Sequence, residues 1–200
     1  MLPESYLASK DATLATIIES TPTFKKTDWN NDVYLALLES IVSQQISVKA
    51  ADSIFARFRA LFEDLYPHPA LLLQKSNEEL RSAGLSFQKI NYLQNVAIFA
   101  TEKGIDYQHL NLLNDDEIVA YLTPIKGVGR WTVEMLLMFV MDRPDVFPVD
   151  DLVIRQKMVR AYNLTETGRV LHKQLHAIAE NWRPYRTMAC RYLWRWKPEG

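Results

Sequence analysis

The sequence is poor in the residues that build disulfide frameworks and metal clusters. Only one of its 200 residues, Cys190, is a cysteine. A single cysteine excludes an internal disulfide and any zinc or iron–sulfur site made of four cysteines. Because disulfide-stapled folds belong to oxidising compartments, we expect a protein of the reducing interior of the cell.

Long apolar runs and an excess of charge are also lacking. No stretch reaches the roughly 18 apolar residues of a membrane span, and Glu4, Lys10 and Asp11 interrupt the N-terminal apolar residues, which argues against a signal peptide. The formal net charge of −1 is not typical of a nucleic-acid-binding protein. Residues 151–200 nevertheless carry a net charge of +6, and the first 150 residues carry −7. The basic quarter is either a surface that faces phosphates or the solvated outer side of helices.

Glycine is scarce too, with six residues, and no segment alternates apolar and polar residues over the length of a strand. Leucine, isoleucine and alanine recur instead at spacings of three and four, which predicts an all-α fold. Proline and glycine residues separate the helices. The predicted helices span residues 7–18, 33–43, 47–61, 77–83, 87–103, 115–122, 131–141, 151–161, 166–180 and 185–194.

The stretch from residue 124 to 156 holds most of the candidate chemistry, and it begins with a glycine hairpin. Gly127 and Gly129 allow positive φ and close approach of another molecule. A helix that begins after Gly129 directs its unpaired N–H groups outward, which suits a phosphate oxygen. Lys126 and Arg130 flank the turn and add positive charge where a DNA backbone would run. An ordinary corner between two helices needs the same glycines, so the hairpin alone does not distinguish a DNA-binding turn from a purely structural one.

The helix that follows the hairpin is apolar on nearly every side. Between residues 131 and 141 the only charged side chain is Glu134, so we expect this helix to be buried. Trp131 at its start is either a core residue or an exposed aromatic wall. Trp194 and Trp196 near the C-terminus leave the same two alternatives open.

Two adjacent aspartates come next. Pro148 halts the chain and an apolar run restarts a helix, so Asp150 and Asp151 lie at its N-terminus. Capping and the helix dipole explain one aspartate. One of the two is therefore left as a candidate catalytic carboxylate. Gln44 and Gln45, at the junction of two apolar helices, are by themselves typical of a solvated corner.

Several motifs in this order resemble one known family. The segments "GVGRWTVEMLLMF" and "PDVFPVDDLVIRQ", together with "IVSQQISVKAA", "GLSFQKINYL" and "WRPYRTMACRYLWRW", are similar to the helix–hairpin–helix DNA glycosylase superfamily. Within it they resemble the alkylpurine branch, the 3-methyladenine DNA glycosylase II type. The resemblance covers roughly residues 30–196.

The resemblance implies two helical subdomains with a DNA-binding cleft between them. One subdomain would comprise about residues 30–113, and the other about residues 1–29 with 114–200. It also implies a monofunctional enzyme that flips alkylated purines out of duplex DNA and hydrolyses the N-glycosidic bond. Asp151 matches the essential aspartate, whereas alignment on "PVD" selects Asp150. If Asp151 is catalytic, Asp150 is left to cap the helix.

Other roles implied by the resemblance concern DNA contacts and the base pocket. Gln45 matches the side chain that fills the gap left by the flipped nucleotide, and Trp131 and Trp194 match pocket aromatics. Met135 stands where a further aromatic can occur, and Lys126 replaces a frequent proline. Bifunctional relatives carry a lysine at the position of Trp131, so no lyase activity is expected. The residues expected to contact DNA are Gln44, Gln45, Lys126, Gly127, Val128, Gly129 and Arg130.

We expect no cofactor, apart from a structural Na⁺ or K⁺ that the resemblance places at the hairpin backbone of Gly127 and Gly129. The expected partner is double-stranded DNA with alkylated bases, bound by a monomer without a membrane anchor. The expected location is the cytoplasm, at the nucleoid in a bacterium, or the nucleus in a eukaryote. Two alternatives stay open: a glycosylase for oxidised or deaminated purines, and a non-catalytic protein that binds damaged DNA.

Overall fold

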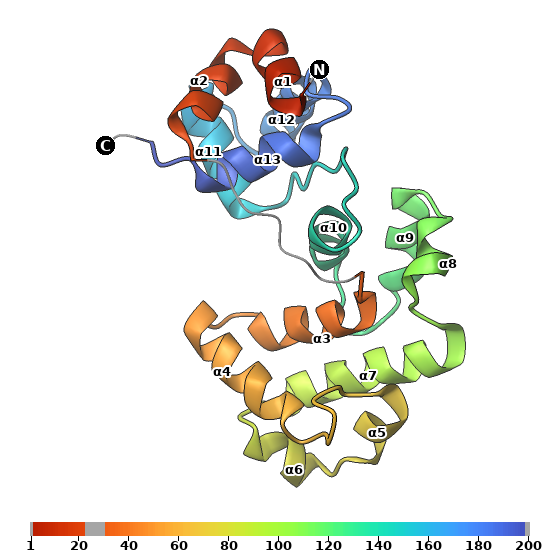
Figure 1. Cartoon of the computed structure of the whole chain (residues 1–200). Coiled ribbons are helices and arrows are strands. Elements are labelled where there is room, and N and C mark those ends of the chain that lie inside the picture. Colours follow the sequence, from red (N-terminus) through yellow and green to blue (C-terminus); the bar gives the residue numbers. More distant parts are fainter. Residues whose placement is uncertain (1, 23–30, 199–200) are drawn as a thin grey trace. The chain divides into compact units, whose positions relative to one another are not determined.

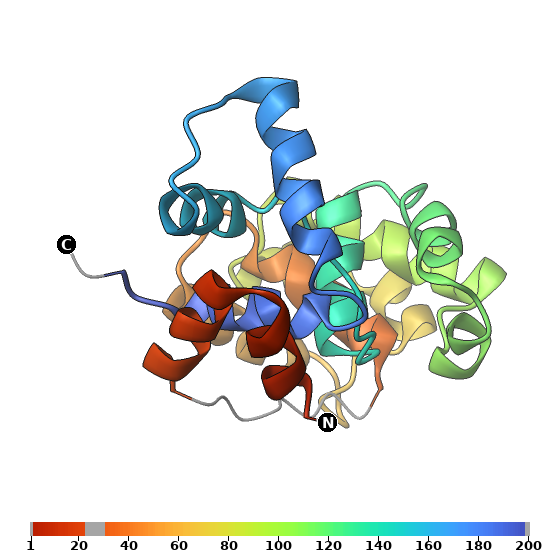
Figure 2. The same ribbon diagram turned by 90° about the horizontal axis from the view of Figure 1, so that it is seen from above.

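The computed structural model describes residues 2–22 and 31–198, which form thirteen α-helices and no strand (Figure 1 and Figure 2). The predicted all-α class is confirmed. Within this part of the chain, no helix combines the length and the apolar character needed to cross a membrane. The helices are α1 Pro3–Lys10, α2 Ala12–Ser20, α3 Val33–Ser43, α4 Val48–Arg59, α5 Pro69–Gln74, α6 Asn77–Ser82, α7 Phe87–Lys103, α8 Tyr107–Asn111, α9 Asp115–Leu122, α10 Arg130–Phe139, α11 Leu152–Ala161, α12 Gly168–Glu180 and α13 Arg186–Arg195.

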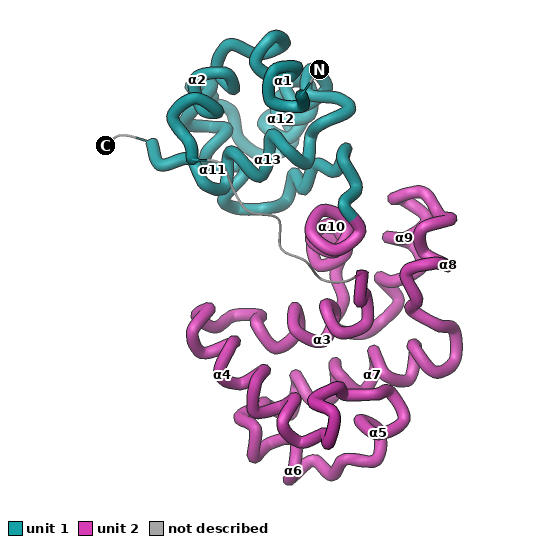
Figure 3. The backbone as a smooth tube through the Cα atoms, in the orientation of Figure 1, with its two compact units in different colours: residues 1–27, 142–200 teal, residues 28–141 magenta. Residues whose placement is uncertain are grey.

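The helices form two compact units, which are coloured separately in Figure 3. Unit 1 comprises residues 1–27 and 142–200, and unit 2 comprises residues 28–141. This division differs from the expected boundary near residue 113, because the hairpin and α10 group with residues 28–113. The reason is packing: α10 contacts both α3 and α9 within unit 2.

Unit 2 is built around α7, the longest helix, which packs against α3, α5 and α6 (Figure 1). Its inward face carries Ile90, Leu93 and Val96, and none of these side chains is exposed. Side chains of Ser47 and Ser86 cap α4 and α7 by accepting backbone N–H groups, as the sequence predicted. The caps fix where α4 and α7 begin, and with them the turns that precede these helices.

Unit 1 is organised around Asp11, which divides one predicted helix into α1 and α2. Asp11 has an extended backbone with φ −148°, and its Oδ1 accepts the Leu14 N–H at 3.0 Å as the cap of α2. Its Oδ2 accepts the Tyr162 hydroxyl at 2.6 Å and the Trp182 indole N–H at 2.8 Å. Burial, followed by the hydrogen bond to Asp11, raises the pKa of the Tyr162 hydroxyl. One carboxylate therefore joins the N-terminal helices to the C-terminal part of the unit.

Two short helices, α5 and α8, were not predicted. They have six and five residues, which leaves little room for a helical repeat of apolar residues. Helix α6 also has six residues but was predicted, because Gly84 marks its end.

Asp11→Ala is expected to destabilise the protein by about 3 kcal/mol, because it removes a helix cap and leaves the donors of Tyr162 and Trp182 without their charged acceptor. Urea unfolding followed by circular dichroism measures the change. Glu19→Ala, at an exposed position of α2, is the matched control. A loss below about 1 kcal/mol for Asp11→Ala would show that the three hydrogen bonds do not hold unit 1 together.

Candidate functional site

The glycine hairpin joins α9 to α10, and its two apolar residues anchor it to unit 2. Ile125 and Val128 are 3% and 4% exposed, and the Val128 N–H donates to the Ile125 carbonyl at 2.9 Å. Gly129 is the N-cap residue of α10, and no side chain caps this helix. Helix α10 therefore begins directly after Gly129, as the sequence predicted, and no side chain caps its first turn.

The two glycines of the hairpin differ in backbone conformation and in the space around them. Gly127 has φ +102°, and a Cβ atom there would lie 2.4 Å from Cγ of Tyr92 on α7. Gly129 has φ −92°, so the expected positive φ is wrong at this position. A Cβ atom on Gly129 would meet no described atom within 4 Å. Packing within the described chain thus requires glycine at 127 but not at 129.

The α3–α4 turn is fastened to this hairpin inside unit 2. Gln44, the C-cap residue of α3, donates from Nε2 to the Gly127 carbonyl at 3.3 Å across 83 residues of sequence. Lys89 on α7 donates from Nζ to the Val42 carbonyl at 2.6 Å, and burial lowers the pKa of its ammonium group. Gln45 lies exposed at the tip of the turn with φ +61°. The adjacent glutamines therefore differ: the side chain of Gln44 joins the turn to the hairpin, and Gln45 is exposed at the tip of the turn.

The paired aspartates also have separate places. Asp151 is the N-cap residue of α11 and is only 7% exposed. Its Oδ1 accepts the Ile154 N–H at 2.9 Å and the Trp194 indole N–H at 3.0 Å. Asp150 is exposed and precedes the cap. The expectation that Asp150 caps the helix is therefore wrong, because the turn in which the Asp151 N–H donates to the Pro148 carbonyl at 2.9 Å places Asp151 at the helix start.

A family model described as HhH-GPD superfamily base excision DNA repair protein matches residues 38–184 of this chain. The chain belongs to this superfamily. The predicted family is thus confirmed, and the matched residues include the α3–α4 turn, the hairpin and both aspartates.

Several relatives agree with this membership. DNA-3-methyladenine glycosylase 1 of Schizosaccharomyces pombe is 37% identical over 165 residues, which cover 81% of this chain and 71% of that protein. The structure of the Schizosaccharomyces pombe 3-methyladenine DNA glycosylase Mag1 with abasic DNA gives a TM-score of 0.81 at 31% identity and covers 96% of this chain and 94% of that chain. The DNA-3-methyladenine glycosidase of Bacillus halodurans gives 0.79 at 32% identity and covers 97% of this chain and 88% of that chain.

In this member of the superfamily, α10 is mostly buried, but its first two residues, Arg130 and Trp131, are exposed. Trp131 is 43% exposed, Met135 is half-buried, and the remaining inward positions are buried as predicted. Glu134 is buried, and its Oε1 accepts Arg130 Nε at 3.0 Å. Arg130 also lies 3.7 Å from Asp116, although 59% of its side chain is exposed. Carboxylates thus offset part of the charge that Arg130 brings to the hairpin. Lys126, on the other side of the turn, is also exposed.

Helix α13 supports the aspartate-bearing loop at both of its ends. Near its start, the Thr187 hydroxyl donates to the Arg143 carbonyl at 2.6 Å and accepts the Val146 N–H at 3.0 Å. Arg186 donates to Asp145 at 2.7 Å. Near its other end, Trp194 donates to Asp151, as described above. This support was not predicted from the sequence, although Arg186 and Thr187 lie in the family-like segment that ends in Trp196.

Part of the basic C-terminal quarter is used inside unit 1. Lys157 donates to backbone carbonyls, Arg183 and Arg186 pair with Asp145, and Arg191 lies 3.9 Å from Asp142. The net charge of residues 151–200 therefore overstates the charge that is available to phosphates.

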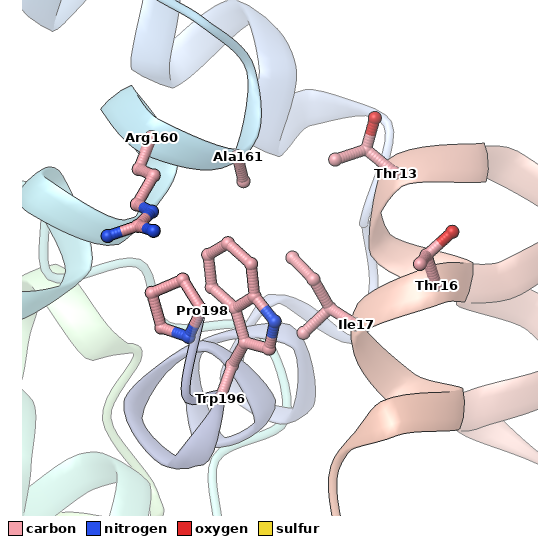
Figure 4. Close-up of a pocket in the computed structure, with 7 residues that line it drawn as sticks. All are labelled: Thr13, Thr16, Ile17, Arg160, Ala161, Trp196 and Pro198. Carbon is pink, nitrogen blue, oxygen red and sulfur yellow. The ribbon is translucent and has the colours of Figure 1, made fainter. Parts of the chain in front are cut away.

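Trp196 belongs to a separate pocket of about 360 Å³ within unit 1 (Figure 4). Its indole faces Ile17 on α2 and Ala161 at the end of α11. The pocket is lined by Thr13, Thr16, Ile17, Arg160, Ala161, Trp196 and Pro198. None of the expected site residues lines it, which separates Trp196 from Trp194.

Gly127→Ala is expected to destabilise the protein by about 2 kcal/mol or more, because the new methyl group meets the base of the Tyr92 side chain and the backbone has a positive φ. Thermal unfolding measures the loss. In a Tyr92→Ala background, where the collision is removed, the further loss from Gly127→Ala should be smaller. Equal losses in both backgrounds would contradict the packing explanation.

Proposed function

We propose that this protein is a monofunctional DNA glycosylase that excises alkylated purines from duplex DNA in base excision repair. Superfamily membership and the names of its relatives support the reaction class and the substrate. The observation that carries the proposal is the carboxylate of Asp151, which is buried and held by two N–H donors.

Excision begins with rotation of the damaged nucleotide out of the helix, which costs a few kcal/mol of stacking and pairing. Gln45 is proposed to fill the resulting gap, and its exposed position at the tip of the α3–α4 turn supports this role. Gln44 acts indirectly in this proposal, since its side chain ties the same turn to the hairpin.

The hairpin is proposed to hold one DNA strand through its main chain. The uncapped first turn of α10 supplies N–H groups that suit a phosphate oxygen, and the space around Gly129 lets a backbone come close. Lys126 adds charge beside it. The carbonyls of Gly127 and Gly129 already accept Gln44 Nε2 and the Val133 N–H at 3.2 Å. Because a carbonyl oxygen has two lone pairs, each keeps one for the structural Na⁺ or K⁺ that is proposed at this backbone.

Alkylation of a ring nitrogen leaves a cationic purine, which is attracted to aromatic faces with about 0.5–2 kcal/mol. Trp131 and Trp194 are the proposed aromatic contacts, with Met135 beside Trp131 on α10. The Trp194 N–H is directed to Asp151, so its ring faces rather than its polar edge are the parts left for the base.

Bond cleavage develops positive charge on the deoxyribose, and a carboxylate beside it stabilises that charge and orients the attacking water. Asp151 is the proposed catalytic residue. Because the cationic base is a good leaving group, a second carboxylate is unnecessary, in contrast to the paired acids of sugar hydrolases. Asp150, which is exposed and does not cap α11, has no assigned step.

Asp151→Asn is expected to reduce the single-turnover rate of base release from methylated duplex DNA by at least about 100-fold, since the charge is lost. Asparagine still caps a helix, so folding and DNA affinity should persist. Released 3-methyladenine is quantified by chromatography. Asp150→Asn, the matched control, should stay within about twofold of the unsubstituted protein.

Each other result of this assay has a clear meaning. Full activity of Asp151→Asn would refute the assignment, and loss in Asp150→Asn alone would move the role to Asp150. Excision restricted to oxidised or deaminated purines would replace the proposed substrate. An inactive unsubstituted protein that still binds damaged DNA would identify a non-catalytic binding protein.

Gly129→Ala is expected to weaken binding to a duplex with an abasic-site analogue by about tenfold, which is about 1.4 kcal/mol. The methyl group stands where the strand approaches, while φ −92° suits alanine and nothing in the described chain collides with it. Fluorescence anisotropy gives the affinity, and unfolding should change by only about 0.5 kcal/mol. Unchanged affinity would exclude close contact between Gly129 and DNA.

A further inference from the structure

Lys157 on α11 holds the C-terminal end of α13. Its Nζ donates to the carbonyl of Trp194 at 2.7 Å and to the carbonyl of Trp196 at 2.6 Å. The last carbonyls of a helix have no partner within the helix, and a lysine there satisfies them and interacts favourably with the helix dipole. Lys157 is therefore a side-chain cap for α13.

The same contact closes a ring between two helices. Asp151 is the N-cap of α11, and Lys157 lies further along that helix. Trp194 on α13 reaches both: its indole N–H donates to Asp151, and its carbonyl accepts from Lys157. Helix α11 thus forms hydrogen bonds to both the side chain and the main chain of Trp194.

The contact from Lys157 is important because Trp194 lies in the last turn of α13, which ends at Arg195. Terminal turns of helices fray. At the other end of α13, Arg186 and Thr187 already fix the helix to the loop of residues 143–146. Lys157 supplies the corresponding anchor at the end that carries the donor to Asp151.

Lys157 also differs from the solvated basic residues of this part of the chain. It is half-buried, and burial lowers the pKa of its ammonium group. Lys173 on α12, by contrast, is exposed. The Lys157 ammonium is thus directed into the protein and not towards a phosphate.

We propose that Lys157 is a positioning residue of the glycosylase reaction, which caps the last turn of α13 and so keeps the Trp194 indole N–H on Asp151. This inference rests on the proposed function. It assigns Lys157 an effect on the rate of base release and none on the affinity for DNA.

Lys157→Met keeps the length of the side chain and removes its donors. It is expected to lower the single-turnover rate of base release about tenfold with unchanged affinity for DNA, because a small misplacement of reacting groups is costly. Lys157→Arg, which can donate to two carbonyls, should keep most of the rate. Lys173→Met is the matched control for charge and should change neither quantity.

A phosphate contact predicts the opposite pattern. Weaker DNA binding by Lys157→Met, with an unchanged rate at saturating enzyme, would overturn the proposal. If Lys157→Met does not fold, Lys157→Gln keeps one neutral donor and is subject to the same comparison.

A double-substitution cycle tests whether Lys157 acts through Trp194. Trp194→Phe removes the indole N–H and keeps an aromatic ring. In that background, adding Lys157→Met should change the rate by less than about twofold, because contacting residues in one network are not additive. A second full tenfold loss would show that the two residues act independently and would refute the ring.

A measurement without activity separates this inference from the assignment of Asp151. The Trp194 indole N–H resonance of ¹⁵N-labelled protein, identified with Trp194→Phe, should shift in Lys157→Met and stay in place in Lys157→Arg. The resonances of Trp131 and Trp182 should not move, whereas Trp196, whose carbonyl also accepts from Lys157, is left out of the comparison. An unchanged Trp194 resonance would refute the positioning role even if Asp151 proves catalytic. A shifted resonance would show that Lys157 holds the Trp194 indole in place, whether or not Asp151 proves catalytic.

Discussion

The hydrogen bonds to the Asp151 carboxylate are the constraint on which unit 1 and its proposed chemistry depend. One oxygen accepts a helix N–H and an indole N–H, so a single side chain begins α11 and fixes its orientation towards α13. The observed cap of Asp151 is compatible with its proposed catalytic role. A carboxylate that must be held still is well placed at a helix start, because the cap geometry limits its rotamers.

The rest of unit 1 supports that carboxylate from several sides. Asp11 ties α1 and α2 to Tyr162 and Trp182, and α13 is anchored near its start by Thr187 and near its end by Lys157. These contacts are charged or directional, and they join segments far apart in sequence. Such networks position groups within narrow limits, which hydrophobic packing alone does less well.

In unit 2, contacts with α7 and a hydrogen bond from Gln44 fix the backbone of two turns. Two residues of α7 contact these turns: Tyr92 packs beside Gly127 of the hairpin, and Lys89 donates to the Val42 carbonyl before the α3–α4 turn. Gln44 links the two turns by its hydrogen bond to the Gly127 carbonyl. The proposed DNA contacts are thus loops carried by a rigid helix. This arrangement is common where a binding loop must keep its shape against its partner.

The sequence by itself determined the long helices, the caps at Ser47 and Ser86, and the family. These depend on local spacing and on motifs in order, which are written along one chain. Helices α5 and α8 show little of that signal. The break at Asp11 was missed although Asp11 caps α2 locally, on the Leu14 N–H, whereas its bonds to Tyr162 and Trp182 were not readable from the sequence. The choice between Asp150 and Asp151 as cap, the different reasons for Gly127 and Gly129, and the place of Lys157 were decided only by the tertiary structure. Gly127 meets Tyr92, and Trp194 contacts both Asp151 and Lys157, across segments that are far apart in sequence. A local sequence pattern does not show which distant residue packing brings close.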